Sequence, residues 1–160
     1  MKVIADKTGS LISTSARYGA MFSGASPEVT QALTQYGESM GLVFQLADDI
    51  IDIASSSSES GKTQGTDLRE GVPTLVPLII LESNRAEDAE LKVRLSAPIT
   101  DDALVEQTLE ELRNNPALDK AKKVVSDLAI QANGFLDVLP ESPAKSALIE
   151  LTNAVISRTA

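Results

Sequence analysis

The chain has 160 residues, enough for one ordinary domain. Its 14 Lys and Arg residues against 23 Asp and Glu residues give a formal net charge of −9, which disfavours nucleic acid or an anionic membrane as a partner. The sequence contains no Cys and no His, which excludes disulfides, imidazole bases and metal sites built from thiolate or imidazole. Any bound metal must therefore take oxygen ligands, as Mg²⁺, Mn²⁺ and Ca²⁺ do.

Nothing in the sequence reads as a secretory signal, because no long apolar core follows the first lysines. The apolar stretches are short and interrupted, so we expect no transmembrane helix. These patterns predict a cytoplasmic protein.

The sequence is rich in Ala and Leu and lacks convincing alternating strands, which predicts an all-α fold. A first helix is expected over residues 3–22, with a break over 23–27. Ser26-Pro27-Glu28 has the features of a helix start, and the helix it begins is expected to run to residue 54. Gly37 and Gly41 lie one turn apart in that helix and predict a closely packed neighbouring helix.

Four turn-forming residues predict a loop over residues 59–73, namely Gly61, Gly65, Gly71 and Pro73. Beyond it we expect a sequence of helices with no repeat and no interdomain linker. Their expected positions are 74–83, one or two short helices in 84–100, 101–113, 115–139, and a last helix from Ser142-Pro143 onward.

Three carboxylates interrupt the apolar run over residues 41–53: Asp48, Asp49 and Asp52. On a helix they project into an arc of about 100°. A solvated acidic face is the ordinary interpretation of such acids, but their neighbours are mostly apolar and no Lys or Arg lies one turn away. Adjacent acids beside a core cost several kcal/mol in desolvation and repulsion, which a divalent cation removes. The spacing does not fit a calcium EF-hand and favours a Mg²⁺ site with positions left for a phosphate.

The next segment supports a phosphate ligand. Gly61-Lys62-Thr63 is similar to the end of a phosphate-binding P-loop, but Ser56 stands where that motif requires Gly, so we reject a P-loop. Near a tri-aspartate metal site, Lys62 instead offers a mobile positive charge to the anion.

The DDxxD pattern, preceded by Phe44-Gln45 and followed by GKxxGxDLxEG, resembles the second aspartate-rich motif of the trans-isoprenyl diphosphate synthases, the polyprenyl synthetase family. Lys7-Thr8 resembles the Lys-Thr pair that the family carries ahead of this motif. The other matching residues are Asp48, Asp49, Asp52, Gly61, Lys62, Gly65, Asp67, Leu68, Glu70 and Gly71.

The resemblance implies an all-α isoprenoid-synthase (terpenoid synthase) helical bundle around a cavity. It implies a prenyltransferase in which Mg²⁺ binds an allylic diphosphate, pyrophosphate leaves, and isopentenyl diphosphate attacks the allylic cation. It also implies roles for individual residues. These are Asp48, Asp49 and Asp52 as Mg²⁺ ligands, Lys7, Thr8, Gln45 and Lys62 as diphosphate contacts, and Asp48, Lys7 and Lys62 as the catalytic group.

Two departures from the family pattern stand out. Val72 stands where many members carry Lys. The first aspartate-rich motif is absent, and Asp101-Asp102 cannot replace it because the third acid is missing. We therefore expect residues 1–160 to be the C-terminal half of a single polyprenyl synthetase domain, inactive without the missing N-terminal half.

Two alternatives remain open: a non-catalytic partner subunit of a complete synthase, and a terpene cyclase of the same fold. The GKxxGxDLxEG run disfavours the cyclase, because the resemblance assigns it to chain-elongating enzymes. A homodimer is expected, since the family is commonly dimeric and a half-domain leaves apolar surface to be covered. The residues that set product length in the family precede the first motif, so no chain length is predicted.

Overall fold

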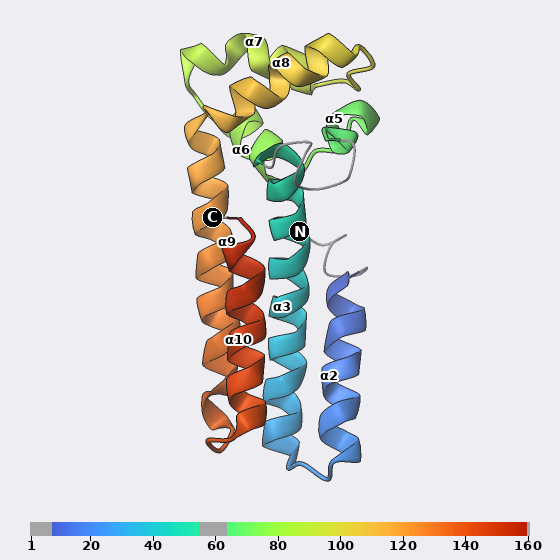
Figure 1. Ribbon diagram of the computed structural model, residues 1–160, viewed down its shortest axis with the longest axis vertical. Helices are drawn as coiled ribbons and strands as arrows, with labels where there is room; N and C mark the ends of the chain where they lie inside the picture. Colours follow the sequence, from blue (N-terminus) through green and yellow to red (C-terminus); the bar gives the residue numbers. More distant parts are fainter. Residues whose placement is uncertain (1–7, 55–63, 160) are drawn as a thin grey trace. The chain divides into compact units, whose positions relative to one another are not determined.

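The computed structural model describes residues 8–54 and 64–159. All regular elements in these two ranges are helices, which confirms the all-α prediction. The chain divides into two compact units, one formed by residues 1–47 with 124–160 and the other by residues 48–123. The long helices α3 (Pro27–Ala54) and α9 (Pro116–Gly134) each contribute to both units (Figure 1). Across the described ranges, no helix is both long and apolar enough to cross a membrane.

The first unit contains α2 (Ser10–Phe22), α10 (Pro143–Ser157) and the adjoining parts of α3 and α9 (Figure 1). Helix α3 has the predicted limits. Its start is capped by Ser26, whose Oγ accepts a hydrogen bond from the Val29 amide at 3.3 Å. The part of the first predicted helix before residue 8 lies outside the described residues.

Helices α2 and α3 approach each other closely at two glycines of α3, as predicted. A Cβ atom on Gly41 would lie 2.5 Å from the Cα of Gly9, and one on Gly37 would lie 2.7 Å from the Cα of Ser13. The Ser13 hydroxyl also donates to the Thr34 carbonyl at 3.1 Å. A side chain at either glycine would push the two backbones apart, so the glycines fix the spacing of α2 and α3.

Helix α10 is joined to α3 by a buried tyrosine. The Tyr36 hydroxyl donates to the Leu148 carbonyl at 2.9 Å and lies 3.1 Å from the Thr152 hydroxyl. Burial raises the pKa of Tyr36, against a smaller opposite effect of the Thr152 hydrogen bond. Helix α10 begins as predicted, with the Ser142 hydroxyl accepting from the Lys145 amide at 3.2 Å.

Within the described residues, the second unit contains the ends of α3 and α9 that fall in residues 48–123, together with four further α-helices. These are α5 (Thr66–Glu70), α6 (Leu75–Glu82), α7 (Ala89–Leu95) and α8 (Asp102–Arg113), with a 3₁₀ turn at Ala86–Asp88. The 3₁₀ turn and α7 match the one or two short helices predicted in 84–100.

One predicted element was wrong, and one predicted helix changes type near its end. The predicted loop over 59–73 contains helix α5, which begins after Gly65, with φ of 69°, and ends before Gly71. The two glycines therefore lie at the ends of a short helix that buries Leu68. The turn-forming residues alone did not predict this helix. The helix predicted over 115–139 is α-helical only to Gly134 and continues as a 3₁₀ helix at Phe135–Val138.

Helix α8 supports α5. Its own start is capped by Asp101, which accepts from the Leu104 amide at 2.8 Å, and its inner face buries Val105, Leu109 and Leu112. A Cβ on Gly65 would lie only 2.7 Å from Val105. Helix α5 is also joined to α8 by an ion pair between Arg69 and Asp102 at 2.5 Å. These contacts set the position of α5 within the second unit.

Candidate metal-diphosphate site

The structure brings together the two uncharged residues that the resemblance assigns to diphosphate binding. The Thr8 hydroxyl donates to the Gln45 side-chain carbonyl at 3.3 Å. Gly41 lies one turn before Gln45. Because Gly41 has no side chain, the backbone of Gly9 packs directly against it, and Thr8 is the residue next to Gly9. Close packing of α2 on α3 therefore places this hydroxyl and this amide side by side in the first unit.

The three aspartates of the DDxxD pattern lie in the last turns of α3, in the second unit. Asp49 is buried, with only 7% of its surface exposed, and Asp48 and Asp52 are partly buried. The apolar residues between them are also buried, with Ile50 at 0% and Ile53 at 3% exposed. The acids therefore do not form a fully solvated face, in agreement with the prediction that this part of the helix is mostly buried.

A fourth carboxylate, Asp67 of α5, belongs to the same group, and the sequence analysis gave it no role. Burial raises its pKa to about 6, with further increases from the negative charges of Asp52, Asp49 and Glu70 in that order. The fold has thus brought Asp67 near the two aspartates of α3. Its place in the GKxxGxDLxEG run was the available signal, but the sequence does not show that α5 folds back toward α3.

Arg113, the last residue of α8, connects the two chain segments that carry these acids. Its Nε donates to the Ile53 carbonyl at 2.8 Å, next to Asp52, and its Nη2 donates to the Gln64 side chain at 3.1 Å. The remaining nitrogen, Nη1, lies 3.5 Å from the Glu106 carboxylate. The end of α3 and the residue before Gly65 are therefore attached to one guanidinium group.

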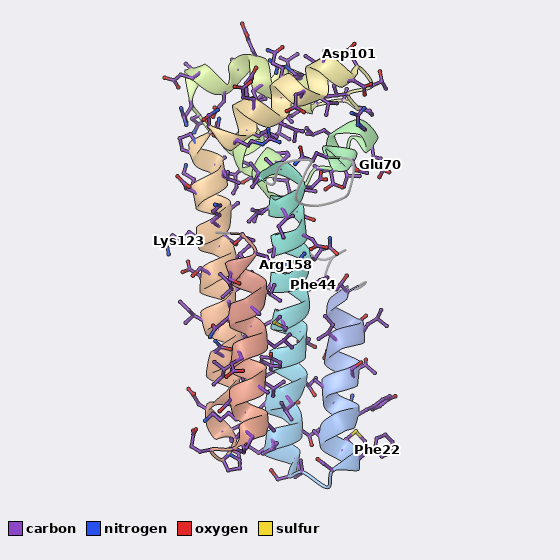
Figure 2. The ribbon with its side chains drawn as sticks, viewed as in Figure 1. Phe22, Phe44, Glu70, Asp101, Lys123 and Arg158 are labelled. Atoms are coloured by element: carbon purple, nitrogen blue, oxygen red, sulfur yellow. The ribbon has the colours of Figure 1, made fainter. Side chains whose placement is uncertain are left out.

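Two of the predicted catalytic residues, Lys7 and Lys62, lie outside the described residues. Within residues 8–54 and 64–159, no three carboxylates are arranged to hold a metal ion by themselves. Val72, which stands at the position of a common family Lys, is 45% exposed. In the first unit, Phe44 lies beneath the Arg158 guanidinium, whose central carbon is 5.8 Å from the ring centre (Figure 2).

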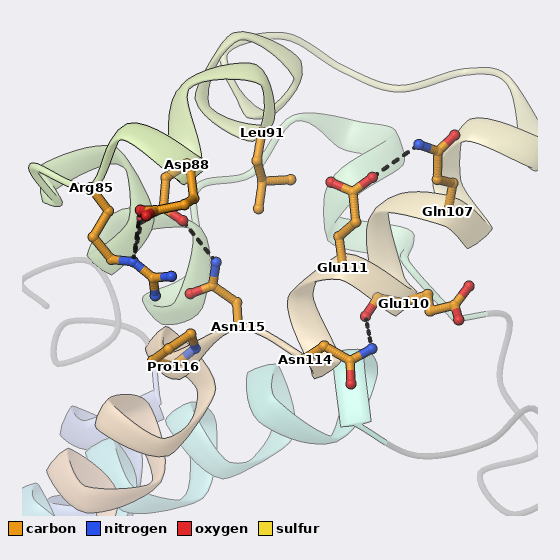
Figure 3. Close-up of a pocket in the computed structure, with 10 residues that line it drawn as sticks. Arg85, Asp88, Leu91, Gln107, Glu110, Glu111, Asn114, Asn115 and Pro116 are labelled. Carbon is orange, nitrogen blue, oxygen red and sulfur yellow. Dashed lines mark hydrogen bonds and ion pairs between the residues drawn. The ribbon is translucent and has the colours of Figure 1, made fainter.

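A separate cavity of about 510 Å³ lies in the second unit, between the 3₁₀ turn with α7 and the end of α8 (Figure 3). None of the predicted site residues lines it. Two of its carboxylates are held by hydrogen bonds or an ion pair. Asp88, 2% exposed, accepts hydrogen bonds from Ser83 at 2.5 Å and from Asn115 at 2.9 Å. Glu111 is paired with Arg94 at 2.9 Å.

The pKa values of these two carboxylates move opposite to that of Asp67. The hydrogen bonds from Ser83 and Asn115 lower the pKa of Asp88, and the hydrogen bond from Arg94 lowers the pKa of Glu111. The ionised forms of Asp88 and Glu111 are therefore stabilised by the protein itself, which is what structural carboxylates require.

Comparison with known proteins assigns the family. The family model for polyprenyl synthetase matches residues 1–112. The chain is 46% identical over 158 residues to nonaprenyl diphosphate synthase of Mycobacterium tuberculosis, a match that covers 99% of this chain and 47% of that protein. The chain therefore belongs to the polyprenyl synthetase family, and it spans about half the length of the curated relatives it matches.

Solved structures agree with this assignment. The crystal structure of geranylgeranyl pyrophosphate synthase from Corynebacterium glutamicum, complexed with calcium and isoprenyl diphosphate, matches with a TM-score of 0.90 and 41% identity over 99% of this chain and 49% of that chain. A polyprenyl synthase from Caulobacter crescentus, also complexed with calcium and isoprenyl diphosphate, matches with a TM-score of 0.88 and 31% identity, covering 99% and 48% of the two chains. The helical isoprenoid-synthase fold predicted from the resemblance is thus confirmed.

Proposed function

We propose that this chain belongs to a Mg²⁺-dependent prenyltransferase and supplies the part of its active site that carries the second aspartate-rich motif. The enzyme would condense an allylic diphosphate with isopentenyl diphosphate into a longer polyprenyl diphosphate. The observation that carries the proposal is the gathering of Asp49, Asp52 and Asp67 from two separate segments. Burial of Asp67, followed by the negative charges of Asp52 and Asp49, raises its pKa to about 6, so its ionised form is unfavourable in the metal-free protein, and a bound cation would offset that cost. The names of the relatives support the same chemistry.

The donors fit Mg²⁺. All are carboxylate oxygens, which hard divalent cations prefer. Mg²⁺ usually binds through one or two carboxylates together with waters and substrate phosphate oxygens. We propose Asp48, Asp49 and Asp52 as the residues that hold it. When bound, the metal would stabilise the negative charge that develops on the departing pyrophosphate.

In this reaction the bond between the allylic carbon and the diphosphate oxygen breaks, and pyrophosphate leaves with the electron pair. The double bond of isopentenyl diphosphate attacks the allylic cation to form the new carbon–carbon bond, and loss of a proton restores a double bond. We propose that Thr8 and Gln45 orient the diphosphate through neutral hydrogen bonds. Lys7 and Lys62 would offset its charge, a contribution that needs no protein nucleophile.

The decisive experiment uses the intact natural protein with radiolabelled isopentenyl diphosphate and allylic diphosphates of 5, 10 and 15 carbons. We expect Mg²⁺-dependent formation of longer polyprenyl diphosphates and no product in EDTA. Allylic substrate consumed without incorporation of label would identify a cyclase instead. Failure to bind Mg²⁺ and pyrophosphate, with activity only beside a second synthase, would identify a non-catalytic subunit.

We also propose that residues 1–160 act as the C-terminal half of one domain, since the sequence carries the second aspartate-rich motif but not the first. Chain elongation by these 160 residues alone would refute this. The same polypeptide should still bind Mg²⁺ and pyrophosphate weakly in isothermal titration.

A homodimer is proposed as well, supported by a stripe of exposed apolar side chains on α2. Leu11, Tyr18 and Phe22 are 69%, 54% and 88% exposed, and Phe22 extends away from the helix (Figure 2). A stable monomer in sedimentation of the intact protein at high concentration would contradict this proposal. The cytoplasmic location stays a prediction.

A further inference from the structure

We propose that Arg113 is a positioning residue for the metal-diphosphate site. It would hold the end of the aspartate helix α3 and the start of the Asp67 segment at a fixed separation. This inference rests on the proposed function above and goes beyond the family motifs, since Arg113 lies in none of them. It concerns only the second unit, where all of its partners are found.

The contact with α3 is made where a helix needs a partner. The last four carbonyl groups of an α-helix have no amide of their own helix to accept from, and the Ile53 carbonyl is one of them. The Nε of Arg113 donates to it at 2.8 Å, and a cation near a helix C-terminus is also favoured by the helix dipole. Asp52 immediately precedes Ile53, so this bond restrains the backbone that carries the third aspartate.

The second contact reaches the other segment. The Nη2 of Arg113 donates to the Gln64 side chain at 3.1 Å, and Gln64 immediately precedes Gly65, the residue from which α5 starts. Asp67 lies in the first turn of α5. One planar guanidinium therefore bonds to a residue beside Asp52 and to a residue three positions before Asp67. Burial is the main cause of the raised pKa of Asp67, and the negative charges of Asp52 and Asp49 raise it further. These like charges repel each other across the two segments, and the two hydrogen bonds would oppose that repulsion.

The geometry of arginine suits this task better than that of lysine. The planar guanidinium can donate to both acceptors at once from separate nitrogens, whereas the single ammonium group of a lysine would lie close to only one of them. Arg113 is itself held by its helix, because the preceding Leu112 is fully buried. The third contact, to Glu106, is an outer one: that carboxylate is 69% exposed, so we expect it to contribute little.

The test measures Mg²⁺ dependence in the intact natural protein. Isothermal titration with inorganic pyrophosphate at several Mg²⁺ concentrations gives the half-saturating Mg²⁺ concentration, and steady-state assays give kcat and KM. For Arg113→Ala we expect a half-saturating Mg²⁺ concentration raised by about tenfold to a hundredfold, as is typical when a residue supporting metal ligands is lost. Arg113→Lys should restore only part of this loss. Glu106→Gln, the matched control, should stay within about twofold of wild type.

A structural role alone would lower the thermal midpoint without changing the Mg²⁺ requirement of the protein that remains folded. Should Arg113→Ala fail to fold, Gln64→Ala removes only one acceptor and should still raise the requirement. Where the two single variants and the double variant all fold, the effects of Gln64→Ala and Arg113→Ala on the half-saturating Mg²⁺ concentration should be less than additive. Both substitutions remove the same hydrogen bond. Variants at both positions that keep the wild-type Mg²⁺ requirement would overturn the positioning role.

Asp48→Ala separates this proposal from the proposed function. If Asp48→Ala abolishes Mg²⁺-dependent pyrophosphate binding while the Arg113 and Gln64 variants bind normally, the positioning role alone is wrong. If Asp48→Ala binds as wild type does, the metal-diphosphate site itself is wrong, and the role of Arg113 is overturned with it.

Discussion

Two groups of carboxylates in the second unit differ in how their charge is managed. Around the cavity, Asp88 accepts hydrogen bonds from Ser83 and Asn115, and its pKa falls. At the end of α3, Asp67 is partly buried beside Asp52 and Asp49, and its pKa rises to about 6. Burial opposes ionisation in both places, but only Asp88 has donors that more than compensate for it. Asp88 is thus a carboxylate whose charge the protein itself stabilises, whereas Asp67 is one whose charge the metal-free protein disfavours, as the proposed cation site would require.

The largest effect expected from this comparison is on catalysis. Asp48→Ala in the intact enzyme should lower kcat by about 10²- to 10³-fold, the usual cost of losing one electrostatic contribution to a transition state. We expect the thermal midpoint in metal-free buffer to stay near the wild-type value, because the proposed role of Asp48 is to hold the metal ion. Glu38→Ala, at an exposed acid on the same helix, is the matched control and should leave the rate unchanged. A metal-free protein destabilised by Asp48→Ala would show instead that Asp48 is structural, as Asp88 is.

A second prediction concerns the uncharged contact, where packing rather than charge sets the geometry. Gly41→Ala should destabilise the protein by about 3 kcal/mol, at the upper end for overpacking, since its Cβ would lie 2.5 Å from backbone of α2. It should also weaken pyrophosphate binding by separating Thr8 from Gln45. Gly19→Ala is the matched control: its Cβ would meet nothing within 4 Å, so higher helix propensity should stabilise it by about 0.5–1 kcal/mol. Equal chemical denaturation midpoints for the two variants would disprove the close approach.

Features that depend on neighbouring residues in the sequence could be predicted, whereas features that depend only on contacts between distant segments could not. Helix α3 and its cap at Ser26 were predictable because the Ser-Pro-Glu signal and the apolar pattern are local. The close approach at Gly41 was predictable because two glycines one turn apart inside a helix usually allow a neighbouring backbone to pack closely. Helix α5 was missed because glycines flanking a short helix give the same sequence signal as glycines in a loop. What distinguishes α5 is the burial of Leu68, which depends on the tertiary structure. The roles proposed for Asp67 and Arg113 could not be predicted, since each depends on contacts with a segment far away in the sequence.

Asp88→Asn tests the carboxylate that the protein itself stabilises. The amide would place a donor against the groups that now donate to Asp88, at a cost of about 2 kcal/mol near neutral pH. Because the folded pKa of Asp88 lies below its ordinary value of 3.8, its contribution is present above that pH and is lost as pH falls through the folded value. The unfolding free energies of wild type and variant in urea should therefore converge only as pH falls below the folded pKa of Asp88, which lies under 3.8. A difference that is independent of pH would mean that packing, not the charge, is what Asp88 supplies.

The smallest expected effect has the opposite sign. Asp67→Asn should stabilise the metal-free protein at pH 7.5 by on the order of 1 kcal/mol, after allowance for solvent screening of a partly exposed group. The folded pKa of Asp67, about 6, lies above its ordinary value of 3.8, so ionisation destabilises the fold above pH 6. The advantage of the variant should shrink as pH falls through 6 and vanish below 3.8, where both states of the wild type are protonated.

Mg²⁺ with pyrophosphate should reverse the order of stability of wild type and Asp67→Asn at pH 7.5. A cation near the acids favours the ionised carboxylate of the wild type, and binding to the folded state raises the unfolding free energy according to affinity. A variant that keeps its advantage in saturating Mg²⁺ and pyrophosphate would show that Asp67 does not sense the ligand. The raised pKa would then be only a consequence of crowding among acids, and the contrast with Asp88 would no longer distinguish a binding group from a structural one.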